Sequence, residues 1–297
     1  MLAEPYPAHP LTPFPPLIIN AALTGIVPTR ERVPHVPLSA AEIVADAERC
    51  AAAGASVLHV HVRDAVGDPT WERAAFAEVV TGIRERCPGV LVCATTSGRS
   101  GAGFAQRTDV LELDDPVRPD LASLTLGSVN FPAGVSVNAI DTVEALARRM
   151  ADRGVRPELE IFDLGMAHLA HRLLRKGLLE GPLWANLMLG FPNGAPANAR
   201  TLVALVDALP DAVTAWAAGG FGAFQQPAGM LAAAMGGHIR TGLEDNPFLD
   251  HATRTPATNA ALVERAAVQA RAAGREVATT AQARAILGLA PVREAVT

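Results

Sequence analysis

The sequence is poor in several residue types, and each shortage excludes a class of protein. Aromatic residues make up 4% and charged residues 19% of the 297 positions, and the formal net charge is −5. Without a basic excess or aromatic clusters the chain offers no surface for polyanions, so we expect no nucleic-acid partner. Lys176 is the only lysine among the 25 basic residues, which leaves one candidate for Schiff-base chemistry.

Cysteine is also scarce, and its spacing speaks against cysteine-based functions. Cys50, Cys87 and Cys93 form no CxxC pair and no disulfide framework, so we expect them buried as small apolar residues. No run approaches ~20 apolar residues, so we expect no membrane span. The proline-rich stretch 1–16 has neither the basic start nor the apolar segment of a signal peptide. We therefore expect an irregular N-terminal arm and a cytoplasmic protein.

The chain alternates short apolar runs with amphipathic segments along nearly its whole length. The apolar runs are bounded by glycine, proline or polar residues, as buried parallel strands are. The predicted strands are 17–22, 56–60, 90–94, 121–125, 158–162, 183–188, 213–218 and 238–242. The predicted helices are 40–53, 71–86, 142–153, 166–176, 199–209 and 227–235, with a short, irregular one at 104–113.

Eight strands alternating with helices indicate an α/β protein whose parallel sheet closes as a (β/α)8 TIM barrel. A doubly wound fold would offer a glycine fingerprint after its first strand, and the stretch 20–25 contains none. Capping boxes are expected at 39–42 and 141–144. Two further helices, 258–273 and 280–287, are expected as C-terminal additions. We expect one barrel domain over 1–297, with 1–16 as its arm.

The strongest functional signal is the sequence His59-Val-His61 at the end of the second predicted strand. Residues two apart on a strand point the same way, so both imidazoles project together. In a barrel, the carboxyl ends of the strands are where active sites form. Two convergent imidazoles there favour half of a divalent metal site, above all for Zn²⁺. The alternative is a pair of buried histidines that are hydrogen-bonded to the backbone.

The last predicted strand and the loop after it carry groups that could complete such a site. A catalytic zinc ion commonly has three protein ligands, and we expect Glu244 to be the third. Arg240, Gly242 and Glu244 share one face, and only the first strand separates this strand from the histidines. Asp245 is expected to act as a general base that Arg240 orients. The alternative is a structural ion-pair network of Arg240, Glu244 and Asp245.

Other polar residues stand near predicted strand ends, where each alone is a weak signal. A hydroxyl in such a place more often fills the barrel or caps a helix. The turns 190–194 and 219–222 carry amides that could approach an anion, although glycine also simply turns the chain. His238 is expected to support the site from beneath. The polar residues are Thr95, Thr96, Ser97, Ser123, Thr125, Glu158 and Glu160.

These motifs together resemble those of a known family, the beta-keto acid cleavage enzymes. The resemblance runs from Leu17 to Leu287 and rests on HxHxR at 59–63 and GGHxRxGxED at 236–245. Further matching segments are 16–25, 53–63, 127–131 and 156–160. The resemblance implies a zinc-dependent barrel that converts a beta-keto acid and acetyl-CoA into acetoacetate and a new acyl-CoA. It also implies a homotetramer.

The resemblance also implies a role for individual residues of this sequence. The family's base matches Asp245, and its oriented cationic partner matches Arg240. The catalytic hydroxyl after the third strand matches Thr95, where the family has serine, and the strand-five acid matches Glu160. The metal ligands match His59, His61 and Glu244. Substrate contacts are expected from Asn20, Val27, Ser123 and Thr125.

Two departures from the family members that cleave 3-keto-5-aminohexanoate bear on the substrate. Val27 stands where those enzymes carry a glutamate suited to a cationic amine. Without that acid a buried ammonium group would have no partner, so we expect an uncharged side chain on the beta-keto acid. Ala223 and Phe224 stand where those enzymes carry arginine and tryptophan, and we expect this to alter how CoA or the substrate is held.

Three other classes of protein carry comparable motifs. A hydrolase of the amidohydrolase type carries HxH on its first strand and adds a mid-barrel lysine or histidines. A metal-dependent lyase acting on 3-hydroxyacyl-CoA carries HxH late in the barrel and a D-R-E run on its first strand. A non-catalytic metal- or metabolite-binding barrel would need neither Asp245 nor Arg240 beside its ligands. The sequence therefore favours the cleavage enzyme.

Overall fold

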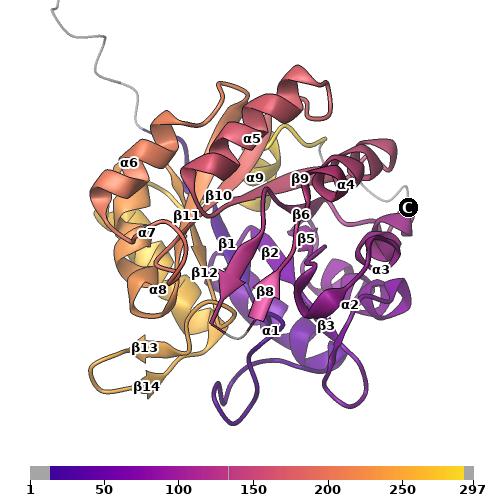
Figure 1. Cartoon of the computed structure of the whole chain (residues 1–297). Coiled ribbons are helices and arrows are strands. Elements are labelled where there is room, and N and C mark those ends of the chain that lie inside the picture. Colours follow the sequence, from indigo (N-terminus) through magenta and orange to yellow (C-terminus); the bar gives the residue numbers. More distant parts are fainter. Residues whose placement is uncertain (1–13, 133, 291–297) are drawn as a thin grey trace, which may run out of the picture.

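The computed structural model describes residues 14–132 and 134–290, so most of the expected arm at 1–16 lies outside the described residues. Eight parallel strands close into a barrel in the order β1-β12-β11-β10-β9-β6-β5-β2. Helices surround these strands (Figure 1). This confirms the (β/α)8 barrel and excludes the doubly wound fold, whose sheet stays open. Within the described ranges no helix is long and apolar enough to cross a membrane.

The barrel strands lie close to their predicted positions. They are β1 (Ile19–Ala22), β2 (Val57–Val60), β5 (Leu91–Ala94), β6 (Leu121–Thr125), β9 (Arg156–Ile161), β10 (Leu183–Leu189), β11 (Val213–Gly220) and β12 (His238–Thr241). β1 begins later than expected because Leu17 forms only an isolated bridge, with Val277. Short loop strands were not predicted, and these are β3 (Val62–Arg63), β4 (Pro69–Thr70), β7 (Val129–Phe131), β8 (Gly134–Ser136), β13 (Phe248–Asp250) and β14 (Thr255–Pro256).

The helices also follow the predicted segments. They are α1 (Ala40–Ala53), α2 (Arg73–Arg86), α3 (Phe104–Asp109), α4 (Ile140–Asp152), α5 (Leu164–Arg175), α6 (Ala199–Asp207), α7 (Gln225–Ala234), α8 (Asn259–Ala272) and α9 (Thr280–Ile286). Three short 3-10 turns are η1 (Arg99–Gly101), η2 (Val110–Glu112) and η3 (Gly222–Phe224). The third helix is short and irregular as expected, because α3 runs directly into η2.

The first expected capping box is confirmed at the start of α1. The Ser39 hydroxyl accepts a hydrogen bond from the Glu42 amide at 3.4 Å, and the Glu42 carboxylate accepts one from the Ser39 amide at 3.0 Å. Gly54 ends the helix with a φ of 117°, which a side chain would strain. Both ends of α1 therefore fall where the local sequence places them.

The second expected capping box, at 141–144, is wrong. α4 begins at Ile140 with Ala139 in the cap position, so Asp141 already lies in the first helical turn and cannot cap it. Glu144 pairs with Lys176 at the end of α5 instead of reaching back to the helix start. This ion pair also accounts for the only lysine of the chain, which does not line the barrel mouth.

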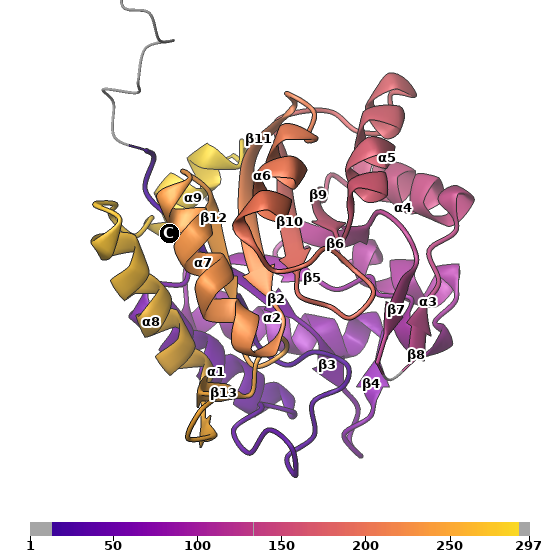
Figure 2. The same ribbon diagram turned by 60° about the vertical axis from the view of Figure 1, so that its left-hand side comes forward.

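The two C-terminal helices have different places in the fold. We expected both as additions, but α8 packs between α7 and α1 and so completes the ring of eight helices. α9 is the addition, and it covers the amino-terminal end of the barrel (Figure 2). There Ala283 and Leu287 pack against Ile18 and Trp184. A ligand therefore enters the barrel from the carboxyl ends of the strands.

The three cysteines and His238 are buried in the fold. Cys50, Cys87 and Cys93 are buried free thiols, as expected. His238 lies on β12, and its Nδ1 accepts a hydrogen bond from the Ile18 amide at 2.9 Å. Burial lowers the pKa of His238 to about 3, so the ring is neutral. His238 thus joins β12 to β1 below the cavity, in the supporting place we expected.

Candidate active site

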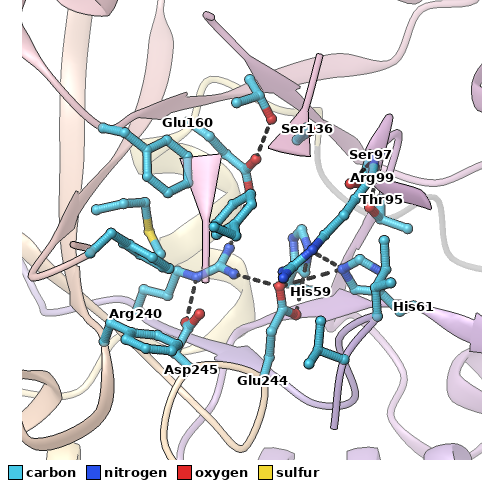
Figure 3. Close-up of a pocket in the computed structure, with 18 of the residues that line it drawn as sticks. His59, His61, Thr95, Ser97, Arg99, Ser136, Glu160, Arg240, Glu244 and Asp245 are labelled. Carbon is cyan, nitrogen blue, oxygen red and sulfur yellow. Dashed lines mark hydrogen bonds and ion pairs between the residues drawn. The ribbon is translucent and has the colours of Figure 1, made fainter. Parts of the chain in front are cut away.

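A cavity opens at the carboxyl ends of the barrel strands (Figure 3). Every expected site residue lines it except Asn20 and Ser123, which lie deeper. The lining residues are Ile26, Val27, Pro28, His59, His61, Thr95, Ser97, Arg99, Thr125, Phe131, Ser136, Glu160, Phe162, Met188, Phe191, Phe221, Arg240, Glu244 and Asp245. The cavity therefore brings together predicted side chains from both halves of the chain.

His59, His61 and Glu244 turn their ligand atoms toward one another (Figure 3). The two Nε2 atoms of the histidines are 3.3 Å apart. Nε2 of His61 lies 3.4 Å from Oε1 of Glu244, and Nε2 of His59 lies 3.8 Å from Oε2 of the same carboxylate. Two nitrogen atoms and a carboxylate thus surround one point, as the three protein ligands of a catalytic zinc ion do.

Two glycines allow Glu244 to reach the histidines. Gly242 follows β12 with a φ of 146°, and a Cβ there would lie 2.0 Å from the carbonyl oxygen of Ala22. The Glu244 amide donates a hydrogen bond to that same oxygen at 3.3 Å. A Cβ on Gly25 would lie 2.7 Å from Cγ of Glu244. The close approach of the loops after β1 and β12 therefore needs glycine at both positions.

Glu158, which we had not assigned a role, holds His59 from below. Its carboxylate lies 3.0 Å from Nδ1 of His59 and accepts hydrogen bonds from Asn20 at 2.8 Å and Trp184 at 3.1 Å. An ionised carboxylate can only accept a hydrogen bond, so Nδ1 of His59 carries a proton toward Glu158, and a bound metal ion would take the lone pair of Nε2. Asn20 therefore acts on Glu158 and does not itself line the cavity.

The electrostatics of these groups also fit a divalent cation. Burial raises the pKa of Glu244, but His61, His59 and Arg240 outweigh it and lower this pKa well below its usual range. Burial lowers the pKa of His61, so its ring is neutral. Oε2 of Glu244 is buried and accepts no hydrogen bond from residues 14–132 or 134–290. An ionised oxygen without a donor, facing two imidazoles, suits a metal ion.

Arg240 is surrounded by carboxylates from β9 and from the loop after β12. It is 1% exposed, and its nitrogens lie 3.0 Å from Asp245, 3.1 Å from Glu244, 3.5 Å from Glu160 and 3.7 Å from Glu158. The ion-pair network that we considered as an alternative therefore exists. It is not purely structural, because Glu244 also faces the histidines and Asp245 lines the cavity.

Asp245 lies beside the ligand set at the cavity wall (Figure 3). Burial raises its pKa to about 6, with Glu244 acting in the same direction and Arg240 opposing it. A carboxyl group whose pKa lies near neutral pH can both take up and return a proton. Its hydrogen bond from Nε of Arg240 at 3.0 Å orients it.

The hydroxyl residues separate into a rim and a deeper layer. At the rim, Thr125 donates a hydrogen bond to Glu160 at 2.6 Å, and Thr95 accepts one from the Ser97 amide at 3.1 Å. Ser123 lies deeper, where its hydroxyl accepts a hydrogen bond from the Thr96 amide at 3.0 Å. Ser123 therefore holds the loop after β5 and does not line the cavity.

One wall of the cavity is apolar, and this wall was not predicted. Phe191 stacks on Phe221 with ring centroids 4.6 Å apart, and Phe131 and Phe162 meet Phe191 edge to face. Phe191 and Phe221 belong to the turns 190–194 and 219–222, which we had considered only for their amides. Each of the four rings follows the carboxyl end of a barrel strand, which was a usable signal.

Arg99 also lines the cavity and was not predicted. Its guanidinium lies over the Phe131 ring, with Cζ 4.2 Å from the ring centroid. Ala223 and Phe224, in contrast, lie in η3 outside the cavity lining. The position that we had connected with CoA binding therefore lies outside this cavity.

The closed (β/α)8 barrel gathers two convergent histidines, several carboxylates and a buried arginine at the end of its strands where the active sites of barrel enzymes lie. The family model for beta-keto acid cleavage enzymes matches residues 16–289. The chain therefore belongs to the beta-keto acid cleavage enzyme family and is an enzyme of that family. This membership sets aside the hydrolase, lyase and non-catalytic alternatives.

Similar proteins cover most of the chain. A 3-oxoadipate:acetyl-CoA acetyltransferase from Cupriavidus necator is 41% identical over 278 residues, covering 92% of this chain and 95% of that protein. A 3-keto-5-aminohexanoate cleavage enzyme from Fusobacterium nucleatum is 38% identical over 274 residues, covering 92% and 98%. The solved apo structure of ObcA matches with a TM-score of 0.75 at 23% identity, covering 86% of this chain and 66% of that chain. The last likeness shows the fold alone.

Proposed function

We propose that this enzyme holds Zn²⁺ through His59, His61 and Glu244 and converts a beta-keto acid and acetyl-CoA into acetoacetate and a new acyl-CoA. The observation that carries the proposal is the convergence of these three ligand atoms beside Asp245 and Arg240. Acetyl-CoA as the second substrate is supported by the names of two relatives, the 3-oxoadipate enzyme and a 3-dehydrocarnitine:acetyl-CoA trimethylamine transferase from Rhizobium meliloti.

The protein's own residues supply proton transfer and orientation in this proposal. A bound zinc ion would supply Lewis acidity for the keto and carboxylate oxygens of the beta-keto acid. Asp245 removes a proton from the carbon between those two groups, and Arg240 keeps the Asp245 carboxylate aimed at it. Thr95 and Glu160 stand at the rim, where they position the acid and the incoming thioester.

The atoms balance without any further reagent. The deprotonated carbon attacks the thioester carbonyl of acetyl-CoA, and the CoA thiolate leaves. The thiolate then attacks the original keto carbon, and the bond from that carbon to the attacking carbon breaks. The released carbon takes back the proton from Asp245. The products are acetoacetate and a thioester of CoA with the remaining acyl group.

The cavity also supports a proposal about the substrate's side chain. Val27 lines the cavity, and no carboxylate stands at that place to pair with an amine, so we propose that the side chain carries no positive charge. The four phenylalanine rings favour an alkyl chain along the apolar wall. The uncharged side chain expected from the sequence fits both observations.

The test is an assay with acetyl-CoA that carries ¹³C at its carbonyl carbon. The zinc-loaded enzyme is given neutral, anionic and cationic beta-keto acids, and both products are read by mass spectrometry. We expect the label in the keto carbon of acetoacetate and an unlabelled acyl-CoA from at least one acid, with no product from the His61→Ala variant. Release of free carboxylic acids without labelled acetoacetate would contradict the proposed exchange of acyl groups. Light scattering of the same preparation tests the expected homotetramer.

A further inference from the structure

Asn259, the first residue of α8, is a fully buried amide that the proposed mechanism does not use. Its Nδ2 donates hydrogen bonds to the Leu23 carbonyl at 2.9 Å and to the Asp46 carboxylate at 2.6 Å. Its Oδ1 accepts a hydrogen bond from the Leu243 amide at 2.7 Å. Both donors of the side chain and its oxygen are therefore bound to groups of the protein.

These hydrogen bonds join the two loops that bring Glu244 to the histidines. Leu243 directly precedes Glu244 in the loop after β12, and Leu23 directly follows β1. The Leu23 amide donates a hydrogen bond to the His59 carbonyl at 3.2 Å. A continuous chain of contacts thus runs from the backbone of one ligand, through Leu23 and Asn259, to the residue before the other. Asn259 is the only side chain in this connection.

Asp46 of α1 keeps the Asn259 amide in its orientation. An ionised carboxylate can only accept hydrogen bonds, and Asp46 also pairs with Arg49 at 2.9 Å. A half-turn of the amide would place its oxygen against Asp46 and the Leu23 carbonyl. The same turn would place its NH₂ group against the Leu243 N–H. Only the observed orientation satisfies every group, so the amide holds both loops at once.

An apolar contact anchors the same segment but gives it no direction. Leu243 packs with Val33 and Val36 of the loop after β1 and with Leu262 of α8. Apolar contacts are non-directional, whereas a hydrogen bond weakens steeply when its donor and acceptor are misaligned. The cluster therefore keeps Leu243 in the core, and the hydrogen bonds of Asn259 determine how the next residue leaves it.

We propose that Asn259 is a positioning residue, which fixes the Glu244 carboxylate beside His59 and His61 before a metal ion binds. The inference rests on the proposed function and adds to it the group that preforms the ligand set. An ion that enters a preformed site does not have to order the loop, so the site binds it more tightly. Partners that orient a metal ligand contribute about 10- to 100-fold to metal affinity.

A double variant that exchanges the two side chains, Asp46→Asn with Asn259→Asp, tests this role at unchanged net charge. The two side chains can keep their mutual hydrogen bond with its direction reversed. An aspartate at position 259 can still accept the Leu243 N–H, but it offers no donor to the Leu23 carbonyl. Equilibrium dialysis against buffered zinc, with thermal unfolding as the check on folding, should show zinc affinity about 10- to 100-fold lower.

Asp46→Asn alone is the matched control, because it changes α1 in the same way and leaves Asn259 its donor to Leu23. It should keep the wild-type zinc affinity. Wild-type affinity in the folded double variant would overturn the inference and leave the proposed function intact. An equal loss of affinity in the double variant and the control would also overturn it, because the donor to Leu23 would then contribute nothing.

Hydrogen exchange of the Leu243 amide provides a second measurement that needs no metal. In the metal-free wild-type protein we expect this amide to exchange as slowly as the amides of β12, with little change when zinc is added. Asn259→Ala should speed its exchange and leave the amides of β6, on the opposite side of the barrel, unchanged. Fast exchange in the wild-type protein until zinc is added would show that the ion orders the loop, against the inference.

The two measurements separate the inference from the proposed function. If the wild-type protein binds no zinc, the proposed function fails, and hydrogen exchange alone decides the role of Asn259. The same holds if the double variant does not fold. Equal acceleration of the Leu243 and β6 amides in Asn259→Ala would reduce Asn259 to a general contribution to stability and so reject its positioning role.

Discussion

The replacement Glu158→Gln should weaken zinc binding although Glu158 does not touch the cavity. The carboxylate accepts the Nδ1 proton of His59 and two further hydrogen bonds, from Asn20 and Trp184. Burial raises the pKa of Glu158, but His59 and Arg240 outweigh it and hold this pKa at about 2, so the group is ionised. Glutamine keeps the shape but offers one acceptor oxygen to three donors.

Either orientation of the new amide disturbs His59. With its NH₂ group toward Nδ1, the ring must move its proton to Nε2, the atom that should bind zinc. With its oxygen toward Nδ1, the NH₂ group opposes the donors of Asn20 and Trp184, at a cost of about 1–3 kcal/mol. Loss of a carboxylate that orients a ligand histidine lowers metal affinity about 10- to 100-fold, and we expect that range here.

Competition with a chromophoric chelator measures the zinc affinity, and thermal unfolding of the same sample confirms that the variant is folded. Glu160→Gln is the matched control, because it makes the same change two residues along β9 without contacting His59. It should keep the wild-type zinc affinity. Wild-type affinity in a folded Glu158→Gln protein would refute the orienting role. An equal loss of zinc affinity in both variants would show that only the removal of one negative charge matters.

Three further outcomes are expected. Asp245→Asn should lower kcat about 10²- to 10⁴-fold at unchanged zinc content, measured by the product assay and metal analysis, and a wild-type rate would exclude Asp245 as the base. Zinc removal by a chelator should lower the Tm, and zinc at about 1,000 times its Kd should restore about 4 kcal/mol, whereas an unaltered Tm would count against a bound ion. The pKa of His238 is lowered from 6.5 in the unfolded chain to about 3 in the folded protein. Between these two values the unfolded chain binds a proton that the folded protein does not, so the free energy of unfolding decreases as the pH falls below about 6.5. His238→Gln should flatten the pH dependence of the unfolding free energy, measured by urea titration, by up to about 1.4 kcal/mol per pH unit, and parallel curves for the two proteins would contradict this origin.

Most of the fold could be predicted because buried parallel strands are continuous apolar runs with abrupt ends. β6 lies at the predicted residues, and α1 does so as well because Ser39 and Gly54 mark its two ends. The hairpins β3–β4, β7–β8 and β13–β14 were missed because two or three residues show no periodicity. The capping box at 141–144 was instead predicted where none forms. Aspartate is favoured both in the cap position and in the first helical turn, so Asp141 alone does not show where the helix begins.

The convergence of His59 and His61 could be predicted because alternation along one strand places both rings on the same side. The depth of a side chain in the barrel could not, because it depends on the register between strands. Ser123 pairs with Glu158, and Thr125 pairs with Glu160, two residues nearer the mouth. Ser123 and Glu158 therefore lie below the cavity, while Thr125 and Glu160 reach its rim. Alternation along the strands is the same for both pairs, so it does not show which pair lies deeper in the barrel.

The carboxylates around Arg240 also determine how substitutions combine. Groups that share one buried guanidinium are thermodynamically coupled, so double-mutant cycles among them will show strong non-additivity. The cavity wall is instead assembled from separate loops that follow β1, β5, β6, β9, β10 and β11. Substitutions on different loops combine more nearly independently, except among the four phenylalanine rings that touch one another. A barrel of this design can acquire new substrates stepwise through its loops, while its charged centre tolerates only coordinated change.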